Sequence, residues 1–420
     1  MVNVLVVGSG GREHALSWKL SNSEQVDEVY IAPGNGGTTQ NIPISVDNIS
    51  ELANFAQEKN CFTVVGPEDP LAAGIVDQFR LQHLPIFGPS KAAAQLESSK
   101  IWAKEFMKRN SIPTAEFSIF DDAQKAKDFV KSYEKPVVIK ADGLAAGKGV
   151  IVCNDKDEAF DAIDTILTKK TFGDAGSKII IEERIDGVEA SYIALCDGKI
   201  GIPMATSQDH KRIFDDDKGP NTGGMGAYSP TPIIDDSLES EIQEKIIDKT
   251  INAMHGEGID FQGFLYAGIM IKDGNPYVLE YNVRMGDPEC QPILMRLDSD
   301  LYSYLVAASE GKLNKLPKIS WKNEYSVCVV LASKGYPKSY PKDEIITGFD
   351  EIQSNSFVFH AGTKKQDGKI LSNGGRVLGV TALGNTLQDA INNAYASCEK
   401  IHWDNKYKRD DIGKKGLSNL

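Results

Sequence analysis

Short apolar runs separated by stretches with helical spacing recur through the first hundred residues. Continuous apolar runs of this length are typical of strands buried on both faces, as in parallel sheets. Each run ends in a loop rich in glycine or proline, which is expected at the ligand-binding edge of a doubly wound sheet. The predicted strands are 2–7, 28–32, 62–66 and 85–88.

A second α/β pattern begins near residue 120, after a predicted helix over 101–109 and a connection at 112–114. Its short strands and single helix predict a small unit that can move relative to its neighbours. The expected strands are 136–140, 149–153, 178–182 and 189–196, with a helix over 156–168.

The next stretch, residues 207–230, is polar, rich in glycine and aspartate, and without clean periodicity. We expect a long irregular loop there, and such loops inside compact domains are usually functional. A helix over 237–255 follows. The turn Lys272-Asp273-Gly274-Asn275 then predicts a hairpin between strands 264–271 and 277–281.

The last hundred residues change character and predict a further domain. Strands are expected at 325–332, 358–361 and 376–383, with a turn at 373–375. Thr386 is expected to cap a final helix whose apolar residues repeat at helical spacing.

Composition excludes several classes of protein. A formal charge of −13 disfavours nucleic-acid binding, and no apolar run is long enough to cross a bilayer. The six cysteines form no C-x-x-C pair, and the six histidines lack metal-ligand spacing, so reduced thiols in a cytoplasm are expected and a zinc site is not.

Gly8-Ser9-Gly10-Gly11 lies between a predicted strand and a predicted helix, where backbone N–H groups favour a phosphate. A dinucleotide fingerprint fails because Glu13 replaces the third glycine and residues 31–33 lack the ribose-binding acid. A mononucleotide or sugar phosphate fits this loop better. A tight turn without a ligand remains the alternative.

A second glycine loop, between Lys140 and Gly149, resembles a Walker A loop only superficially, because a strand follows it and no Ser or Thr follows Lys148. The glycines, including Gly143 and Gly147, with a lysine at each end, predict a flap that covers a triphosphate. A plain β-hairpin is the alternative.

Acidic residues mark the end of one predicted strand and the start of the next. Glu182, Glu183 and Ile185 could offer backbone groups to an adenine, and Glu189 a carboxylate to a ribose. Solvated acidic residues at strand ends are the simpler alternative for this segment taken alone.

Glu280, Asn282 and Arg284 alternate along a predicted strand and therefore face the same side. A carboxylate and an amide oxygen suit Mg²⁺, and the arginine can neutralise a carboxylate or phosphate. An exposed polar face of an edge strand is the alternative.

Together these segments resemble the glycinamide ribonucleotide synthetases (phosphoribosylamine–glycine ligases), a family of the ATP-grasp superfamily. The resemblance rests on 8–15, 32–35, 65–68, 139–150, 207–212, 219–230 and 284–289. It implies a multidomain α/β fold with an N-terminal substrate-binding domain of parallel sheet at 1–100. An ATP-grasp domain at 101–322, with a mobile lid at about 121–188, and a C-terminal α+β domain at 323–420 complete it.

The resemblance also implies roles for individual residues. Those implied for ATP are Lys104, Lys140, Gly143, Gly147, Lys148, Gly149, Glu182, Glu183, Ile185 and Glu189. Those implied for the other substrates are Gly10, Gly11, Arg12, Asn35, Glu68, Asp209, Lys211 and Arg284, with Asp209 on the glycine ammonium and Arg284 on its carboxylate. Glu280 and Asn282 would hold Mg²⁺ or Mn²⁺, and Lys140, Lys148, Arg284 and Asp209 would be catalytic.

The implied reaction joins glycine to 5-phosphoribosylamine at the expense of ATP, through a glycyl phosphate, in purine biosynthesis. The resemblance implies a cytoplasmic monomer or weak homodimer without nucleic-acid or membrane partners. Met285 stands where the family usually has Phe, and a packing change is expected. Another ATP-grasp ligase or carboxylase of purine synthesis, or a non-catalytic nucleotide sensor, are the alternatives.

Overall fold

The four strands predicted in the first hundred residues form one parallel sheet, with the order β2-β1-β3-β4. The computed structural model describes residues 1–143 and 149–418. The central strand is fully buried from Val4 to Val7, which explains its unbroken apolar run. The elements are β1 (Val2–Gly8), α1 (Gly11–Leu20), β2 (Val26–Pro33), α2 (Ile49–Lys59), β3 (Cys61–Val65), α3 (Glu68–Ala73), α4 (Ile75–Leu81), β4 (Ile86–Phe87) and α5 (Gln95–Ser98).

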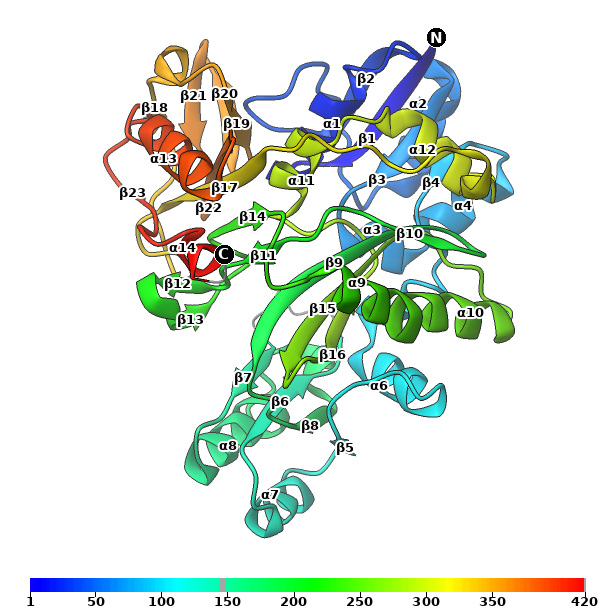
Figure 1. Cartoon of the computed structure of the whole chain (residues 1–420), viewed down its shortest axis with the longest axis vertical. Helices are drawn as coiled ribbons and strands as arrows, with labels where there is room; N and C mark the ends of the chain where they lie inside the picture. Colours follow the sequence, from blue (N-terminus) through cyan, green and yellow to red (C-terminus); the bar gives the residue numbers. More distant parts are fainter. Residues whose placement is uncertain (144–148, 419–420) are drawn as a thin grey trace.

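The small unit is an antiparallel sheet in the order β5-β8-β6-β7, and it projects at the lower end of the molecule in Figure 1. It has its own apolar core, formed by its two main helices against one face of the sheet. The elements are β5 (Phe117–Phe120), α7 (Ala123–Ser132), β6 (Val137–Ala141), β7 (Val150–Val152), α8 (Lys156–Ile163), η1 (Asp164–Thr168), η2 (Gly173–Gly176) and β8 (Ile179–Glu183).

One strand expected in the small unit belongs elsewhere. β9 (Val188–Asp197) pairs along its whole length with β15 (Gln262–Lys272) in the central sheet β10-β9-β15-β16, so its assignment to the small unit is wrong. The hairpin to β16 (Asn275–Asn282) is confirmed, because Lys272 pairs with Asn275 across a two-residue turn. Both turn residues have positive φ, 50° at Asp273 and 78° at Gly274, as such a turn requires.

Helices surround the central sheet, and the helix predicted over 237–255 is confirmed as three consecutive segments. The remaining elements of this region are α6 (Lys100–Arg109), β10 (Gly201–Pro203), α9 (Asp236–Ile242), η4 (Gln243–Asp248), α10 (Lys249–Gly256), α11 (Cys290–Arg296), α12 (Leu301–Ser309) and η5 (Leu313–Lys315).

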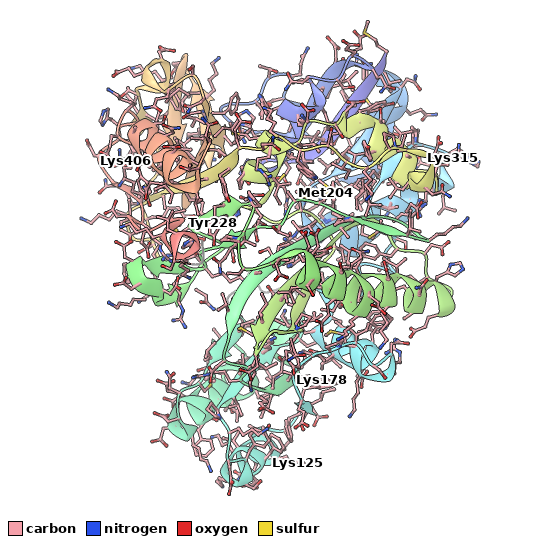
Figure 2. The ribbon with its side chains drawn as sticks, viewed as in Figure 1. Lys125, Lys178, Met204, Tyr228, Lys315 and Lys406 are labelled. Carbon is pink, nitrogen blue, oxygen red and sulfur yellow. The ribbon has the colours of Figure 1, made fainter. Side chains whose placement is uncertain are left out.

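The stretch 207–230, expected to be irregular, contains four short strands. Two of them, β11 (Gln208–Asp209) and β14 (Gly226–Ser229), join the sheet of the C-terminal part, where β14 pairs with β17 (Tyr325–Ser333), so the expectation of a loop is wrong. Glycine-rich, polar strands give no apolar alternation, and their pairing is decided by distant partners. Tyr228 of β14, labelled in Figure 2, is fully buried and its hydroxyl donates to Gln208 of β11.

The strands expected in the last hundred residues are confirmed, as is the helix α13, which Thr386 caps in a reciprocal capping box with Asp389. The elements of the C-terminal part are β11 (Gln208–Asp209), β12 (Arg212–Phe214), η3 (Asp215–Asp217), β13 (Lys218–Asn221), β14 (Gly226–Ser229), β17 (Tyr325–Ser333), β18 (Ile345–Ile346), η6 (Phe349–Glu351), β19 (Ser356–His360), β20 (Thr363–Gln366), β21 (Lys369–Ser372), β22 (Arg376–Gly384), α13 (Leu387–Cys398), β23 (Lys406–Tyr407) and α14 (Lys414–Leu417). No helix within the described ranges has the length and apolar character to cross a membrane.

Buried histidines join the parts of the chain. The backbone N–H of His360 donates to His14 Nδ1 at 2.8 Å, which links the N-terminal helix α1 to β19. Burial lowers the pKa of His14 and of His210 to about 3, and that of His360 to about 4. All three rings are therefore neutral in the folded protein at physiological pH.

As the pH is lowered, the protein should begin to lose stability at a higher pH than titration of its carboxylates alone would cause. Below about pH 6.5 the unfolded chain takes up protons on these histidines while the folded protein does not. Stability should therefore be lost as pH falls from 6.5 toward 4, by at most about 1.4 kcal/mol per pH unit for each histidine. Thermal unfolding at pH 7, 6 and 5 measures this loss. His360→Gln should reduce the slope, whereas replacing the exposed His83 should not.

Candidate active site

Two lysines share one buried carboxylate where the small unit meets the central sheet. Glu182 Oε2, at the end of β8, lies 3.0 Å from Lys104 Nζ and 3.0 Å from Lys140 Nζ. Burial favours the neutral acid, but Lys140 and Lys104 outweigh it and hold the pKa of Glu182 below its ordinary value. Burial lowers the pKa of Lys104 to about 8, with Glu182 opposing. The cluster therefore holds two cations and one anion almost without water.

Both lysines have further partners, which fix their positions. Lys104 Nζ donates to Thr114 Oγ1 at 2.7 Å, and Lys140 Nζ donates to the carbonyl of Leu279 at 2.9 Å. Glu182 Oε1 is buried without a hydrogen-bond partner. An unpaired buried acceptor is costly, so this oxygen is suited to receive a donor from a ligand.

Glu280 lies one residue beyond the carbonyl that Lys140 binds, so the small unit and the end of β16 meet at this cluster. Burial opposes ionisation of Glu280, but Lys211, Lys140, Lys100 and Arg284 together hold its pKa below the ordinary value. Lys211 Nζ is 3.9 Å from Glu280 Oε1. The carboxylate is therefore ionised and faces cationic groups from several elements.

Asn282 and Arg284 complete this edge. Asn282 is the last residue of β16, and Arg284 lies two residues beyond it. The alternation of side chains along a strand therefore does not put Arg284 on the same face as Glu280 and Asn282. Instead, Arg284 Nη2 donates to Asn282 Oδ1 at 3.1 Å, which brings both side chains together. The guanidinium also pairs with Glu97 Oε1 at 2.7 Å and with Glu68 Oε2 at 3.3 Å. Arg284, with Arg12 and backbone hydrogen bonding, lowers the pKa of Glu68 to about 2 although burial alone would raise it.

A hard cation fits the oxygens of Glu280 and Asn282. Mg²⁺ is commonly held by one or two carboxylates, with substrate phosphates and water completing its octahedron. Among the residues described, no set of three His, Cys, Asp or Glu side chains is placed to bind a metal. With Glu280 and Asn282 as its protein ligands, such an ion would take its remaining ligands from phosphate oxygens and water.

Lys211 connects Glu280 to a second acidic group. Its ammonium pairs with Glu189, the second residue of β9, and lies near Asp209 in β11. Burial is the main cause that raises the pKa of Asp209 to about 8; Lys211 opposes it, and Glu289 adds to it. Asp209 is therefore a half-buried acid whose ionised form an incoming cation would favour.

The first glycine loop is filled by a side chain of the protein. Gly10 N–H donates to Glu13 Oε2 at 2.6 Å, and Glu13 Oε1 lies 2.5 Å from Arg12 Nε. A Cβ placed on Gly66 would lie 2.0 Å from Glu13 Oε1, so only glycine leaves room there. Glu13, which breaks the dinucleotide pattern, thus caps α1. The Gly10 N–H predicted for a phosphate is already used, while the Gly11 backbone lies against Asp287 and Gln291.

Asn35, expected near a ribose, holds two domains together. Its side-chain amide donates to the carbonyls of Ser9 at 2.9 Å and His360 at 2.8 Å, and its oxygen accepts the N–H of Gly37. These bonds use both of its amide hydrogens.

The base of the second glycine loop is closed by Ala141 N–H, which donates to the carbonyl of Gly149 at 2.8 Å. The hairpin β6–β7 confirms the predicted strand–loop–strand order, with Lys140 opposite Val150. Gly147 and Lys148 lie outside the described residues. Of the adenine candidates, Glu183 pairs with Lys135 at the surface.

Comparison with known proteins identifies the family of the chain. The phosphoribosylglycinamide synthetase N domain matches residues 2–97, the ATP-grasp (A) domain of the same synthetase matches 98–290, and its C domain matches 326–415. The chain belongs to the phosphoribosylglycinamide synthetase family. The resemblance and the three-part architecture predicted from the sequence are confirmed.

Members of the family are similar over the full chain. The chain is 50% identical over 425 residues to the phosphoribosylamine–glycine ligase of Vibrio parahaemolyticus, covering 99% of each sequence. It is 51% identical over 421 residues to that of Escherichia coli, covering 98% of each. The crystal structure of the Thermotoga maritima phosphoribosylamine–glycine ligase superposes with a TM-score of 0.85 at 35% identity, covering 98% of this chain and 100% of that one.

Several residues of this candidate site have no motif in the sequence. Glu97 binds Arg284, Lys100 Nζ donates to the Gly143 carbonyl at 2.7 Å, and Glu289 accepts from Ser191 Oγ at 3.0 Å. Lys100 lies only four residues before Lys104 on α6, which places both on one helix face and is the one signal that could have found it. Met285 is 1% exposed in the apolar core, as the expected packing role requires.

Proposed function

We propose that the chain ligates glycine to 5-phosphoribosylamine with cleavage of ATP to ADP and phosphate, giving glycinamide ribonucleotide in purine biosynthesis. The observation that carries the proposal is the full-length similarity to phosphoribosylamine–glycine ligases. The continuous cluster that joins Lys140 of the small unit to Glu280 of the central sheet supports it.

The reaction needs two displacements. An oxygen of the glycine carboxylate attacks the γ-phosphorus of ATP, the bond to ADP breaks, and a glycyl phosphate forms. The amine nitrogen of phosphoribosylamine then attacks the glycyl carbonyl carbon, inorganic phosphate leaves with the bonding electrons, and the nitrogen loses a proton. No nucleophilic side chain is required, and the protein contributes positioning and charge neutralisation.

The ATP roles divide by position. Lys104 and Lys140 neutralise phosphates, while Gly143, Gly149 and, outside the described residues, Gly147 and Lys148 cover them. Glu182, Glu183 and Ile185 receive the adenine, which the unpaired Glu182 Oε1 supports. Glu189 receives the ribose, after releasing Lys211.

Glu280 and Asn282 would hold Mg²⁺ or Mn²⁺, which neutralises phosphate charge when bound. Arg284 binds the carboxylate of glycine and Asp209 its ammonium. An ammonium beside Asp209 favours the ionised form of that acid, whereas the desolvation of Asp209 raises its pKa.

The second substrate is assigned to the edge of the first domain. Gly10, Gly11, Arg12, Asn35 and Glu68 are proposed for phosphoribosylamine, with Lys211 between the two sites. Because Gly10 N–H and the Asn35 amide are already bonded within the protein, a phosphate there would have to use Gly11 or exchange with Glu13.

The proposed domain boundaries lie at residues 100 and 322, with the lid at about 121–188. The strands β11 and β14 precede the second boundary in sequence but belong to the sheet of the C-terminal domain. A cytoplasmic location and a monomer or weak homodimer also remain proposals. The described cysteines are all buried and free of disulfides, as reduced thiols require.

An ADP-release assay tests the function against its alternatives. With phosphoribosylamine formed in the cuvette from ribose 5-phosphate and ammonia, ADP release should require glycine and rise with both substrates. Bicarbonate in place of glycine should give only background. Release with bicarbonate would indicate a carboxylase, and nucleotide binding without any release would indicate a sensor.

A further inference from the structure

Glu97 is a buried carboxylate that the proposed chemistry does not use. It lies in the short helix α5 and is 8% exposed, and each of its two oxygens contacts a different residue. Oε2 accepts the backbone N–H of Val283 at 2.7 Å, and Oε1 pairs with Arg284 Nη2 at 2.7 Å. One carboxylate therefore fixes both the backbone of Val283 and the side chain of Arg284, the next residue.

These contacts reach the proposed metal pair through a single intermediate. The Arg284 Nη2 that Glu97 binds is also the donor to Asn282 Oδ1 at 3.1 Å. A second carboxylate, Glu68, meets the same guanidinium at Nε, but at 3.3 Å and from a side chain that is 26% exposed. Of the two carboxylates that contact Arg284, Glu97 therefore makes the shorter contact and is the more deeply buried.

The burial of Glu97 opposes the ionised form of its carboxyl group. Burial raises its pKa to about 7, opposed by Arg284 and Arg12, while Glu68 adds to the rise. A buried ion pair is often no more stabilising than apolar side chains of similar size, so stability alone is a weak reason for this pair. Fixing the direction of a functional guanidinium is a better one.

We propose that Glu97 is a positioning residue for glycine. It fixes Arg284, and through Arg284 the amide of Asn282, in the orientation that receives the glycine carboxylate beside the metal pair. This inference rests on the proposed function, in which Arg284 binds that carboxylate.

The decisive variant is Glu97→Gln, which keeps the shape and an acceptor for Val283 N–H but removes the charge that holds Arg284. In the ADP-release assay, the KM for glycine should rise about 10-fold or more, as expected for a lost charge-assisted hydrogen bond. The KM for ATP should change less than about 2-fold, because Lys104, Lys140 and Glu182 are untouched. Glu97→Asp, which restores the charge, should recover part of the glycine affinity.

Glu105→Gln is the matched control, since Glu105 is exposed on the neighbouring helix α6. It should leave both KM values unchanged. Equal glycine KM in Glu97→Gln and the unmodified protein would overturn the inference, as would losses in Glu97→Asp as large as those in Glu97→Gln.

A double variant covers the case in which Glu97→Gln folds poorly. If Glu97 acts through Arg284, then Glu97→Asp should have little further effect on glycine kcat/KM once Arg284→Lys is present. Additive losses would mean that the two residues act independently, and the inference would fail. Failure of the unmodified protein to use glycine overturns the proposed function together with this inference, whereas normal glycine use with unchanged variants overturns only the inference.

Discussion

Alanine in place of Glu280 is expected to lower the rate of ADP release by about 10³-fold, the size seen when one preorganised charge of a phosphoryl-transfer site is lost. Glu280 is the only carboxylate of the proposed metal pair. Its removal takes away a carboxylate that Lys211, Lys140 and Lys100 all face, although Lys140 keeps Glu182 and Lys211 keeps Glu189. A metal ion at this site would then lose its only carboxylate ligand, and with it the position in which it contacts the γ-phosphate.

The protein should remain folded in this variant. Glu280 lies at the end of β16, its side chain is 34% exposed, and it contributes no apolar packing to the core. Thermal unfolding of the variant checks this, and titration with Mg²⁺ should fail to restore the rate. Near-normal turnover in Glu280→Ala would remove Glu280 from the metal site.

Methionine in place of Lys140 is expected to lower kcat/KM for ATP by about 10²-fold to 10³-fold. Lys140 links the buried Glu182 to the carbonyl beside Glu280, so its loss removes a phosphate partner and leaves Glu182 with Lys104 alone. The loss of stability should be smaller than for a buried carboxylate left unpaired, because Lys104 still compensates Glu182.

Lys125→Met is the control for Lys140→Met. Lys125 is an exposed residue of α7 in the same small unit, labelled in Figure 2, and its replacement should change neither ATP kinetics nor stability. Isothermal titration with a non-hydrolysable ATP analogue separates binding from chemistry. Equal analogue affinity in Lys140→Met and the unmodified protein would show that Lys140 does not contact ATP in the ground state.

Local signals predicted the main apolar strands and several of the helices. The unbroken apolar run of β1, the Asp273-Gly274 turn and the Thr386 cap each act over a few residues, so the sequence alone is sufficient to find them. The family resemblance likewise depended on contiguous motifs, and the full-length comparisons confirmed it.

Sheet membership was less predictable. β9 has the same apolar character whichever sheet it joins, and its pairing with β15 depends on a strand far along the chain. The strands β11 and β14 have too few apolar residues to show alternation, and they are ordered by pairing with each other and with β17.

By itself, the sequence determined the apolar strands, several helices, the two glycine loops and the family to which the chain belongs, because those features depend on neighbouring residues. Only the tertiary structure decided that Glu13 fills the first glycine loop, that Glu182 joins Lys104 to Lys140, and that Glu97 holds Arg284. Buried charges choose partners by proximity in space and by the loss of water around them, and neither is visible in the order of residues along the chain.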